Sequence, residues 1–94
     1  MLRINCFFRL KYESDVDQVK FLARELIEKS RKDAGNIAYD LFQSATDPKV
    51  MMFCETWESG EALKVHAASE HFTRLVPKIE HYSDGPMKLE QFEF

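Results

Sequence analysis

Residues 50–72, VMMFCETWESGEALKVHAASEHF, hold a higher density of groups that can move protons than any other part of this chain. The segment begins with residues 50–58, whose side chains alternate in the period-2 pattern of a β-strand. This alternation places Met51, Phe53, Glu55 and Trp57 on one face, so the carboxylate and the indole share a side of the strand. A carboxylate inside an apolar strand needs a partner or an edge position, which makes Glu55 the more informative of the two.

Two helical segments follow this strand. Ser59 is a good N-cap for the first, which carries His66 on its inner side. Ser69 has the character of a second N-cap, so a new helix is expected from Glu70, with His71 in its first turn. Pro77 lacks a backbone N–H, and we expect a kink or a restart of the helix there.

The rest of the chain supplies the remaining elements of one small domain. Residues 2–10 alternate with one fully apolar face and a mixed face that carries Asn5 and Phe7, which predicts a strand. A helix is expected from Ser14 or Asp15, with a capping box at Ser14, to a cap at Gly35. Residues 36–44 predict a strand that forms a hairpin with residues 50–58, and residues 87–94 predict the last strand.

This order of elements indicates an α+β domain over residues 1–94 with the ferredoxin-like split βαβ arrangement. In it, helices cover one face of an antiparallel sheet. One helical layer cannot bury both faces of a sheet that is apolar on each side. We therefore expect a homodimer that forms through the uncovered sheet face.

Composition excludes several classes of function. The net charge is −3 with both signs mixed along the chain, so no basic stripe for nucleic acid is present. No run approaches the ~20 apolar residues of a membrane span, and the first residues lack the features of a signal peptide. Cys6 and Cys54 are not spaced as zinc ligands and are expected to be buried free thiols. These features favour a cytoplasmic protein that binds neither nucleic acid nor membrane.

The two histidines of residues 50–72 are the candidate bases, because imidazole titrates near neutral pH. On one unbroken helix His66 and His71 would diverge by about 140°. A break near Ser69 relaxes that geometry without adding a third ligand, so no metal site is expected. His81 follows Pro77 near a turn and is expected to be exposed.

The segment resembles the signature of the antibiotic biosynthesis monooxygenase family, in the residues Glu55-x-Trp57-Glu58-Ser59, Ala62-Leu63, His66 and Ser69-x-His71-Phe72. The likeness extends to Gly35-Asn36-Ile37-Ala38-Tyr39 and to the order of the elements. It implies a dimeric α+β barrel. The family includes quinol and anthrone oxygenases, autoinducer-2 processing enzymes and haem-degrading enzymes.

The haem-degrading branch is not indicated. Its first-strand Asn, helical Trp and haem-ligating His correspond here to Phe7, His66 and Val76, and valine cannot ligate iron. The resemblance instead implies a cofactor-independent monooxygenase that uses neither flavin nor metal. Its substrate would be a small electron-rich aromatic compound whose deprotonated form reduces dioxygen.

In this interpretation His66 or His71 takes the substrate proton, and Asn5 with the Trp57 N–H stabilises the resulting oxyanion. The residues expected to line the substrate cavity are Tyr39, Phe53, Phe72, Glu55 and Phe7. Asn5 can take this role only if its face of the first strand turns toward the helices.

Two other functions fit the same residues. An isomerase or processing enzyme for a small phosphorylated signalling metabolite would use the imidazoles to shuttle protons. It would need cationic groups at the mouth of its pocket, for which Arg3, Arg9 or Arg74 could serve. A non-catalytic dimeric ligand-binding module is the third possibility, and it is favoured if the protein's own aromatic side chains fill the pocket.

Overall fold

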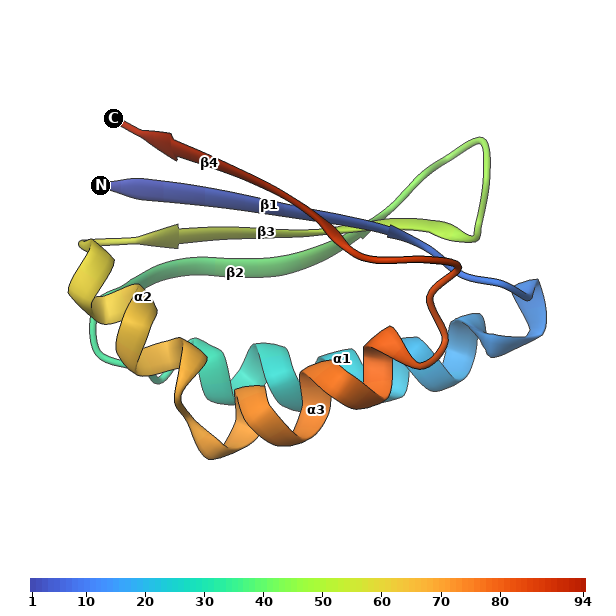
Figure 1. Cartoon of the computed structure of the whole chain (residues 1–94), viewed down its shortest axis with the longest axis horizontal. Helices are drawn as coiled ribbons and strands as arrows, with labels where there is room; N and C mark the ends of the chain where they lie inside the picture. The colour runs from blue at the N-terminus through green and yellow to red at the C-terminus, as the bar shows by residue number, and fades with distance from the viewer.

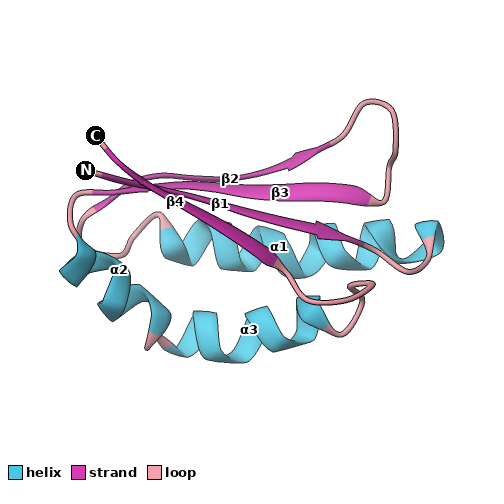
Figure 2. Ribbon diagram, turned by 45° about the horizontal axis from the view of Figure 1, so that its top comes forward, coloured by secondary structure: helices cyan, strands magenta, loops and turns pink.

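The computed structural model describes all 94 residues and shows a sheet with helices on one side (Figures 1 and 2). The elements are β1 (Leu2–Arg9), a 3₁₀ turn (Glu13–Asp15), α1 (Val16–Ser30), β2 (Asn36–Gln43), β3 (Val50–Trp57), α2 (Gly60–Ala67), α3 (Glu70–Glu80) and β4 (Lys88–Glu93). The four strands are ordered β2-β3-β1-β4, and every neighbouring pair is antiparallel. The predicted ferredoxin-like α+β fold is confirmed.

On β1, the inner face of the sheet is the fully apolar face of the sequence pattern. Cys6 of β1 lies opposite Phe53 of β3, and residues that pair directly across antiparallel strands share a face. The buried inner positions are Leu2, Ile4, Cys6 and Phe8 on β1 and Met51, Phe53, Glu55 and Trp57 on β3. This face packs against α1 and α3, and the contact forms the single core of the protein. None of the helices combines the length and the apolar character that crossing a membrane requires.

The outer face carries the mixed residues of β1 and has no helix on it (Figure 2). Arg3, Asn5 and Phe7 alternate with the buried residues of β1 and therefore point outward. Three phenylalanines are exposed on this face: Phe7 at 38%, Phe42 at 53% and Phe92 at 51%. The two cysteines are both free, as predicted, and are on opposite faces of the sheet, with Cys6 buried inside and Cys54 half-buried outside.

Both predicted N-caps in the second half of the chain are confirmed. The Ser59 hydroxyl accepts from the Ala62 N–H at 3.2 Å, and the Ser69 hydroxyl accepts from the Phe72 N–H at 3.3 Å. Each bond satisfies one of the N–H groups that have no partner within the first turn of a helix. The second cap separates α2 from α3.

Three local expectations are wrong. Helix α1 ends at Ser30 rather than at Gly35, because the chain closes turns there, with the Asp33 N–H donating to Ser30 and the Asn36 N–H to Asp33. Ser14 lies in the 3₁₀ turn, and no side chain caps α1. Of the kink or restart expected at Pro77, the restart does not occur, because α3 runs through Pro77 to Glu80.

Gly35 joins these turns to β2 at a point where only glycine fits. Its φ is +81°, a region that side chains with a Cβ rarely adopt. A Cβ added there would lie 2.5 Å from the Cβ of Ala62, at the start of α2. The Gly35 carbonyl also accepts from the Glu58 N–H at 2.8 Å, so the close approach joins the turn before β2 to the end of β3.

We expect Gly35→Ala to lower the free energy of unfolding by more than about 3 kcal/mol, since it adds a clash to a backbone strain of about 1–2 kcal/mol. Gly85→Ala is the matched control, because Gly85 has φ +93° but no atom within 4 Å of the new Cβ. Urea unfolding of both variants measures the difference. Equal decreases in the free energy of unfolding of the two variants would mean that the contact between the added Cβ and Ala62 is not destabilising.

Candidate functional site

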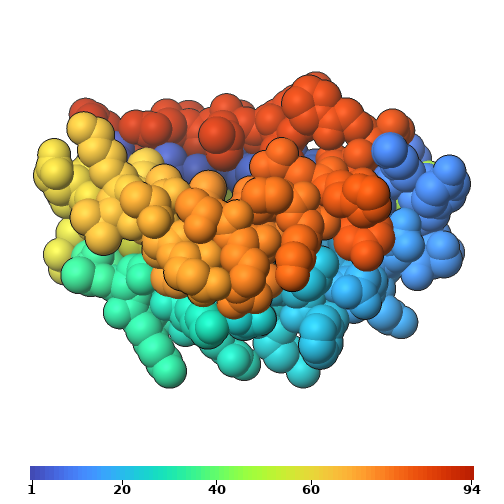
Figure 3. Space-filling view, turned by 60° about the horizontal axis from the view of Figure 1, so that its bottom comes forward, coloured from blue at the N-terminus to red at the C-terminus, as the bar shows by residue number.

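A cavity of about 280 Å³ lies between the sheet and α3. In the space-filling view it opens along a hollow between β4 and α3, where atoms of β1 are visible at the bottom (Figure 3). Nine of its twelve lining residues are apolar, and none is a lysine, arginine or histidine. The volume is just below the range of about 300–1,000 Å³ that is usual for drug-sized ligands, so a small ligand is indicated.

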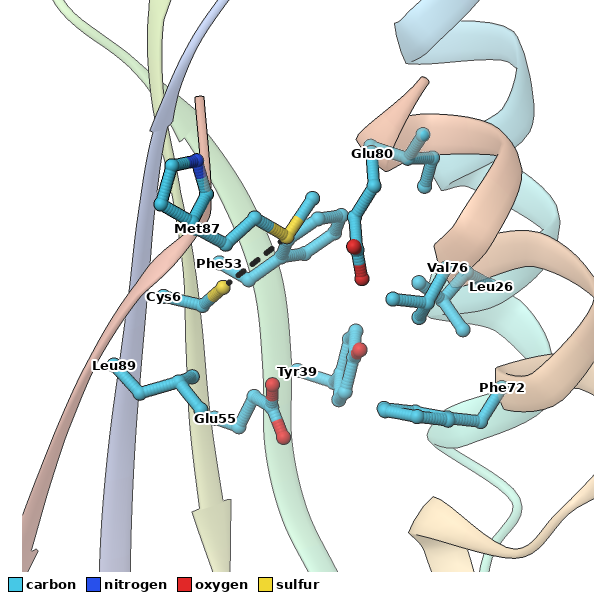
Figure 4. A pocket seen from close by; sticks show the side chains of 12 residues that line it. Cys6, Leu26, Tyr39, Phe53, Glu55, Phe72, Val76, Glu80, Met87 and Leu89 are labelled. Atoms are coloured by element: carbon cyan, nitrogen blue, oxygen red, sulfur yellow. Dashed lines mark hydrogen bonds between the residues drawn. The ribbon is translucent and has the colours of Figure 1, made fainter. Parts of the chain in front are cut away.

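Glu55 is the one buried charged group of the cavity wall. Its side chain extends from β3 into the cavity (Figure 4) and is 7% exposed. Its Oε1 accepts from the indole N–H of Trp57 at 2.9 Å. Burial disfavours the charged carboxylate and raises the pKa of Glu55 to about 7, although the Trp57 hydrogen bond opposes the shift. A carboxyl group with this pKa can take or give a proton near neutral pH.

The two histidines meet at Asp33, which sequence reasoning missed. One oxygen of Asp33, Oδ2, is 2.8 Å from His66 Nδ1 and 2.9 Å from His71 Nε2. The break between α2 and α3 makes this possible, because it turns His71 back toward His66. Asp33 lies in the turn after α1, in an Asp-Ala-Gly segment that reads as ordinary turn sequence, so no signal pointed to it.

This cluster lies behind the cavity rather than in its wall. The ring of His66 is stacked at a tilt against Trp57, with centroids 4.5 Å apart. It also contacts Tyr39 and Phe72, at 5.4 and 5.1 Å, and these two side chains line the cavity. Burial lowers the pKa of His66, and the hydrogen bond to Asp33 opposes that shift. With Asp33 accepting from Nδ1, neutral His66 has its unprotonated nitrogen at Nε2, and this buried atom has no hydrogen-bond partner.

Asp33, His66 and His71 also have the donor types of a two-histidine, one-carboxylate metal site, with all three ligand atoms within 4.8 Å of one another. A metal-bound imidazole almost always donates its second N–H to an acceptor. His66 Nε2 has no such acceptor. The arrangement therefore fits a hydrogen-bonded cluster better than a metal site.

The expected site residues divide into three groups. Glu55, Tyr39, Phe53 and Phe72 line the cavity. His66 and Trp57 lie one layer behind the cavity wall, against Tyr39 and Phe72, and His71 lies beside His66. The structure does not place Asn5 and Phe7 at this site, because they alternate with Cys6, which lines the cavity, and so point to the outer face. Exposed His81, as expected, takes no part.

A comparison of the sequence with protein-family models matches residues 1–78 to the family described as antibiotic biosynthesis monooxygenase. The chain belongs to this family. A curated relative, "Putative monooxygenase YcnE" of Bacillus subtilis, is 27% identical over 95 residues, which span 99% of this chain and 97% of the relative.

Solved structures of similar proteins share the fold over the whole chain. A crystal structure of an antibiotic biosynthesis monooxygenase is 37% identical with a TM-score of 0.93, covering 100% of this chain and 98% of that one. A conserved protein of Bacteroides thetaiotaomicron is 41% identical with a TM-score of 0.91, covering 99% and 96% of the two chains. Family membership predicts oxidoreductase chemistry. The Glu55 carboxylate and the aromatic cavity are the features of this site that such chemistry could use.

We expect the free energy of unfolding of Glu55→Gln, relative to that of the wild type, to be about 2–3 kcal/mol higher at pH 8 than at pH 5. A raised carboxyl pKa means that the folded protein binds the proton more tightly than the unfolded chain. Stability from this group is therefore lost as the pH rises from about 4.5 to about 7.

Urea unfolding of the variant and the wild type at both pH values measures this effect. The lowered pKa of His66 acts in the opposite direction below about pH 6.5, so the difference between the two proteins isolates Glu55. Exposed Glu28→Gln is the control and should show no such difference. A constant difference between wild type and Glu55→Gln across the pH range would contradict the raised pKa.

Proposed function

We propose that the protein is a cofactor-independent monooxygenase that acts on a small aromatic hydroxyl compound of the quinol or anthrone type. The observation that carries this proposal is a buried carboxylate, Glu55, with a pKa of about 7 in a cavity otherwise walled by apolar and aromatic side chains. The apolar wall suits a hydrophobic ring and keeps water from the reacting atoms. Family membership supports the oxidoreductase class.

In the proposed reaction Glu55 removes a proton from the substrate. The resulting electron-rich anion passes electrons to dioxygen and forms a C–O bond with it. The distal oxygen of the resulting peroxide takes back the proton held by Glu55. Loss of the remaining hydrogen, as a proton, from the oxygenated carbon then breaks the O–O bond, which leaves one oxygen as a carbonyl in the product and releases the other as water. The substrate supplies all the electrons, so no flavin or metal is needed.

The proposed base differs from the one that the sequence suggested. The Glu55 carboxylate lies in the cavity wall, whereas neither His66 nor His71 lines the cavity and the ring of His66 packs behind Tyr39 and Phe72. Trp57 orients the carboxylate through its N–H, and the ring of His66 holds Trp57 from the other side. Asn5 has no part in this mechanism, because it lies on the outer face.

A phosphorylated substrate, which the isomerase alternative needs, has no cationic partner at the cavity. The three arginines considered for that role are engaged elsewhere. Arg3 hydrogen-bonds Thr56 and Cys54, Arg9 pairs with Asp47, and Arg74 pairs with Glu25 and Glu70. The cavity therefore favours a neutral substrate over a phosphorylated one.

We expect purified, metal-stripped protein to consume oxygen with at least one member of a panel of anthrones and hydroquinones, and Glu55→Gln to lower kcat by about 10²–10⁴-fold. The rate should rise with pH with an apparent pKa near 7, because only ionised Glu55 accepts a proton. An oxygen electrode measures both effects.

Glu28→Gln, on the exposed side of α1, is the matched control for loss of one carboxylate. The variants His66→Ala and His71→Ala complete the set. Retained turnover in Glu55→Gln, with loss in the histidine variants, would return the role of base to an imidazole. No uptake from any compound by wild type would favour the non-catalytic binding module.

We also propose that two copies of the chain pack through the outer face of the sheet. The exposed rings of Phe7, Phe42 and Phe92 give this face an apolar surface that water disfavours, and no helix of the same chain covers it. A twofold arrangement lets each copy bury the same surface against the other.

We expect Phe42→Glu to convert a dimer of about twice the chain mass into a monomer, because it places a charge among the outer phenylalanines. Sedimentation equilibrium measures the mass. Phe21→Glu is the control, since Phe21 is 72% exposed on α1, on the helical side of the molecule. A wild-type monomer, or a dimer that survives Phe42→Glu, would count against the proposed interface.

A further inference from the structure

Glu80 is a second carboxylate at the cavity that the proposed mechanism does not use. It ends α3, and its side chain points into the cavity from the helical side, while Glu55 points in from the sheet (Figure 4). The Glu80 carboxylate forms no ion pair and no hydrogen bond in the structure, and Glu55 has only the Trp57 N–H. Both carboxylates therefore have free acceptor oxygens facing the same space.

The cavity offers these carboxylates no positive partner of its own. Its only charged lining residues are Glu55 and Glu80. Burial raises the pKa of the Cys6 thiol in the cavity wall, and the two carboxylates add to this shift. An anionic ligand would lose its hydration and meet like charge on two sides, so it is disfavoured.

Between the two carboxylates the walls are aromatic and apolar. Tyr39, Phe53 and Phe72 line this space, and Phe8 stacks on Phe53 with centroids 5.7 Å apart. Such walls suit the faces of a flat ring system, whose ends then approach the acceptor oxygens.

We propose that the cavity binds a neutral aromatic compound with hydroxyl groups at opposite ends, one donating to Glu55 and the other to Glu80, and that Glu80 rejects anionic analogues. This rests on the proposed function only in taking the cavity as the substrate site. It assigns to Glu80 a role in specificity and none in proton transfer.

Isothermal titration calorimetry without oxygen tests the proposal by binding alone. The probes are 2,7-dihydroxynaphthalene and 7-hydroxy-2-naphthoic acid, which differ only in the replacement of one hydroxyl by a carboxylate. We expect wild type to bind the diol at least about tenfold more tightly than the acid. Glu80→Gln should reduce this ratio of the two Kd values to below about threefold, chiefly by lowering the Kd for the acid.

Glu28→Gln, which removes one negative charge from the exposed side of α1, should leave the ratio unchanged. Circular dichroism confirms that each variant is folded. Equal binding of both probes to wild type, binding of neither, or an unchanged ratio in Glu80→Gln would each overturn the proposal. Because no turnover is measured, a protein that discriminates as expected but consumes no oxygen would keep this inference and lose the monooxygenase assignment.

Discussion

Glu55 is buried with one hydrogen-bond donor, the indole N–H of Trp57, and with no cation beside it. This hydrogen bond joins the carboxylate of the cavity wall to the buried core of the protein. Trp57 is fully buried, and the ring of His66 packs on it, so the carboxylate is held by a side chain that is itself fixed in the core. A group placed in this way loses little freedom when a ligand binds, but its ionisation above neutral pH costs stability. The fold therefore gives up some stability to bury this carboxylate beside the cavity.

Local rules were sufficient to predict most of the fold. The alternation along residues 2–10 and 50–58 identified the buried positions, because a one-residue shift would move every apolar side chain to solvent. Ser59 and Ser69 marked the two helix starts through a bond that each makes to its own first turn. The same alternation placed Glu55 beside Trp57. It also showed that Asn5 shares the less apolar face of its strand, which is the face that the helices leave uncovered.

The remaining parts of the site depend on contacts between distant segments, which no local pattern contains. Asp33 joins His66 and His71 only because the turn after α1 lies beside the break between α2 and α3. The angle at that break decides whether two imidazoles five residues apart diverge or converge, and a cap residue predicts the break without its angle. Glu80 is likewise an exposed residue at a helix end, and only the position of the sheet opposite α3 makes it part of the cavity lining.

The sulfur atoms of the cavity bear on the proposed oxygen chemistry. Cys6 lines the cavity with its Sγ 3.6 Å from the Sδ of Met87. Oxidation of cysteine proceeds through the thiolate, so a low thiol pKa beside a reaction with dioxygen would inactivate the protein. Burial, with Glu55 and Glu80 adding to it, raises the pKa of Cys6 to about 11 and keeps it protonated. In the proposed reaction the thiol that shares the cavity with Glu55 and Glu80 therefore stays in its less reactive, protonated form.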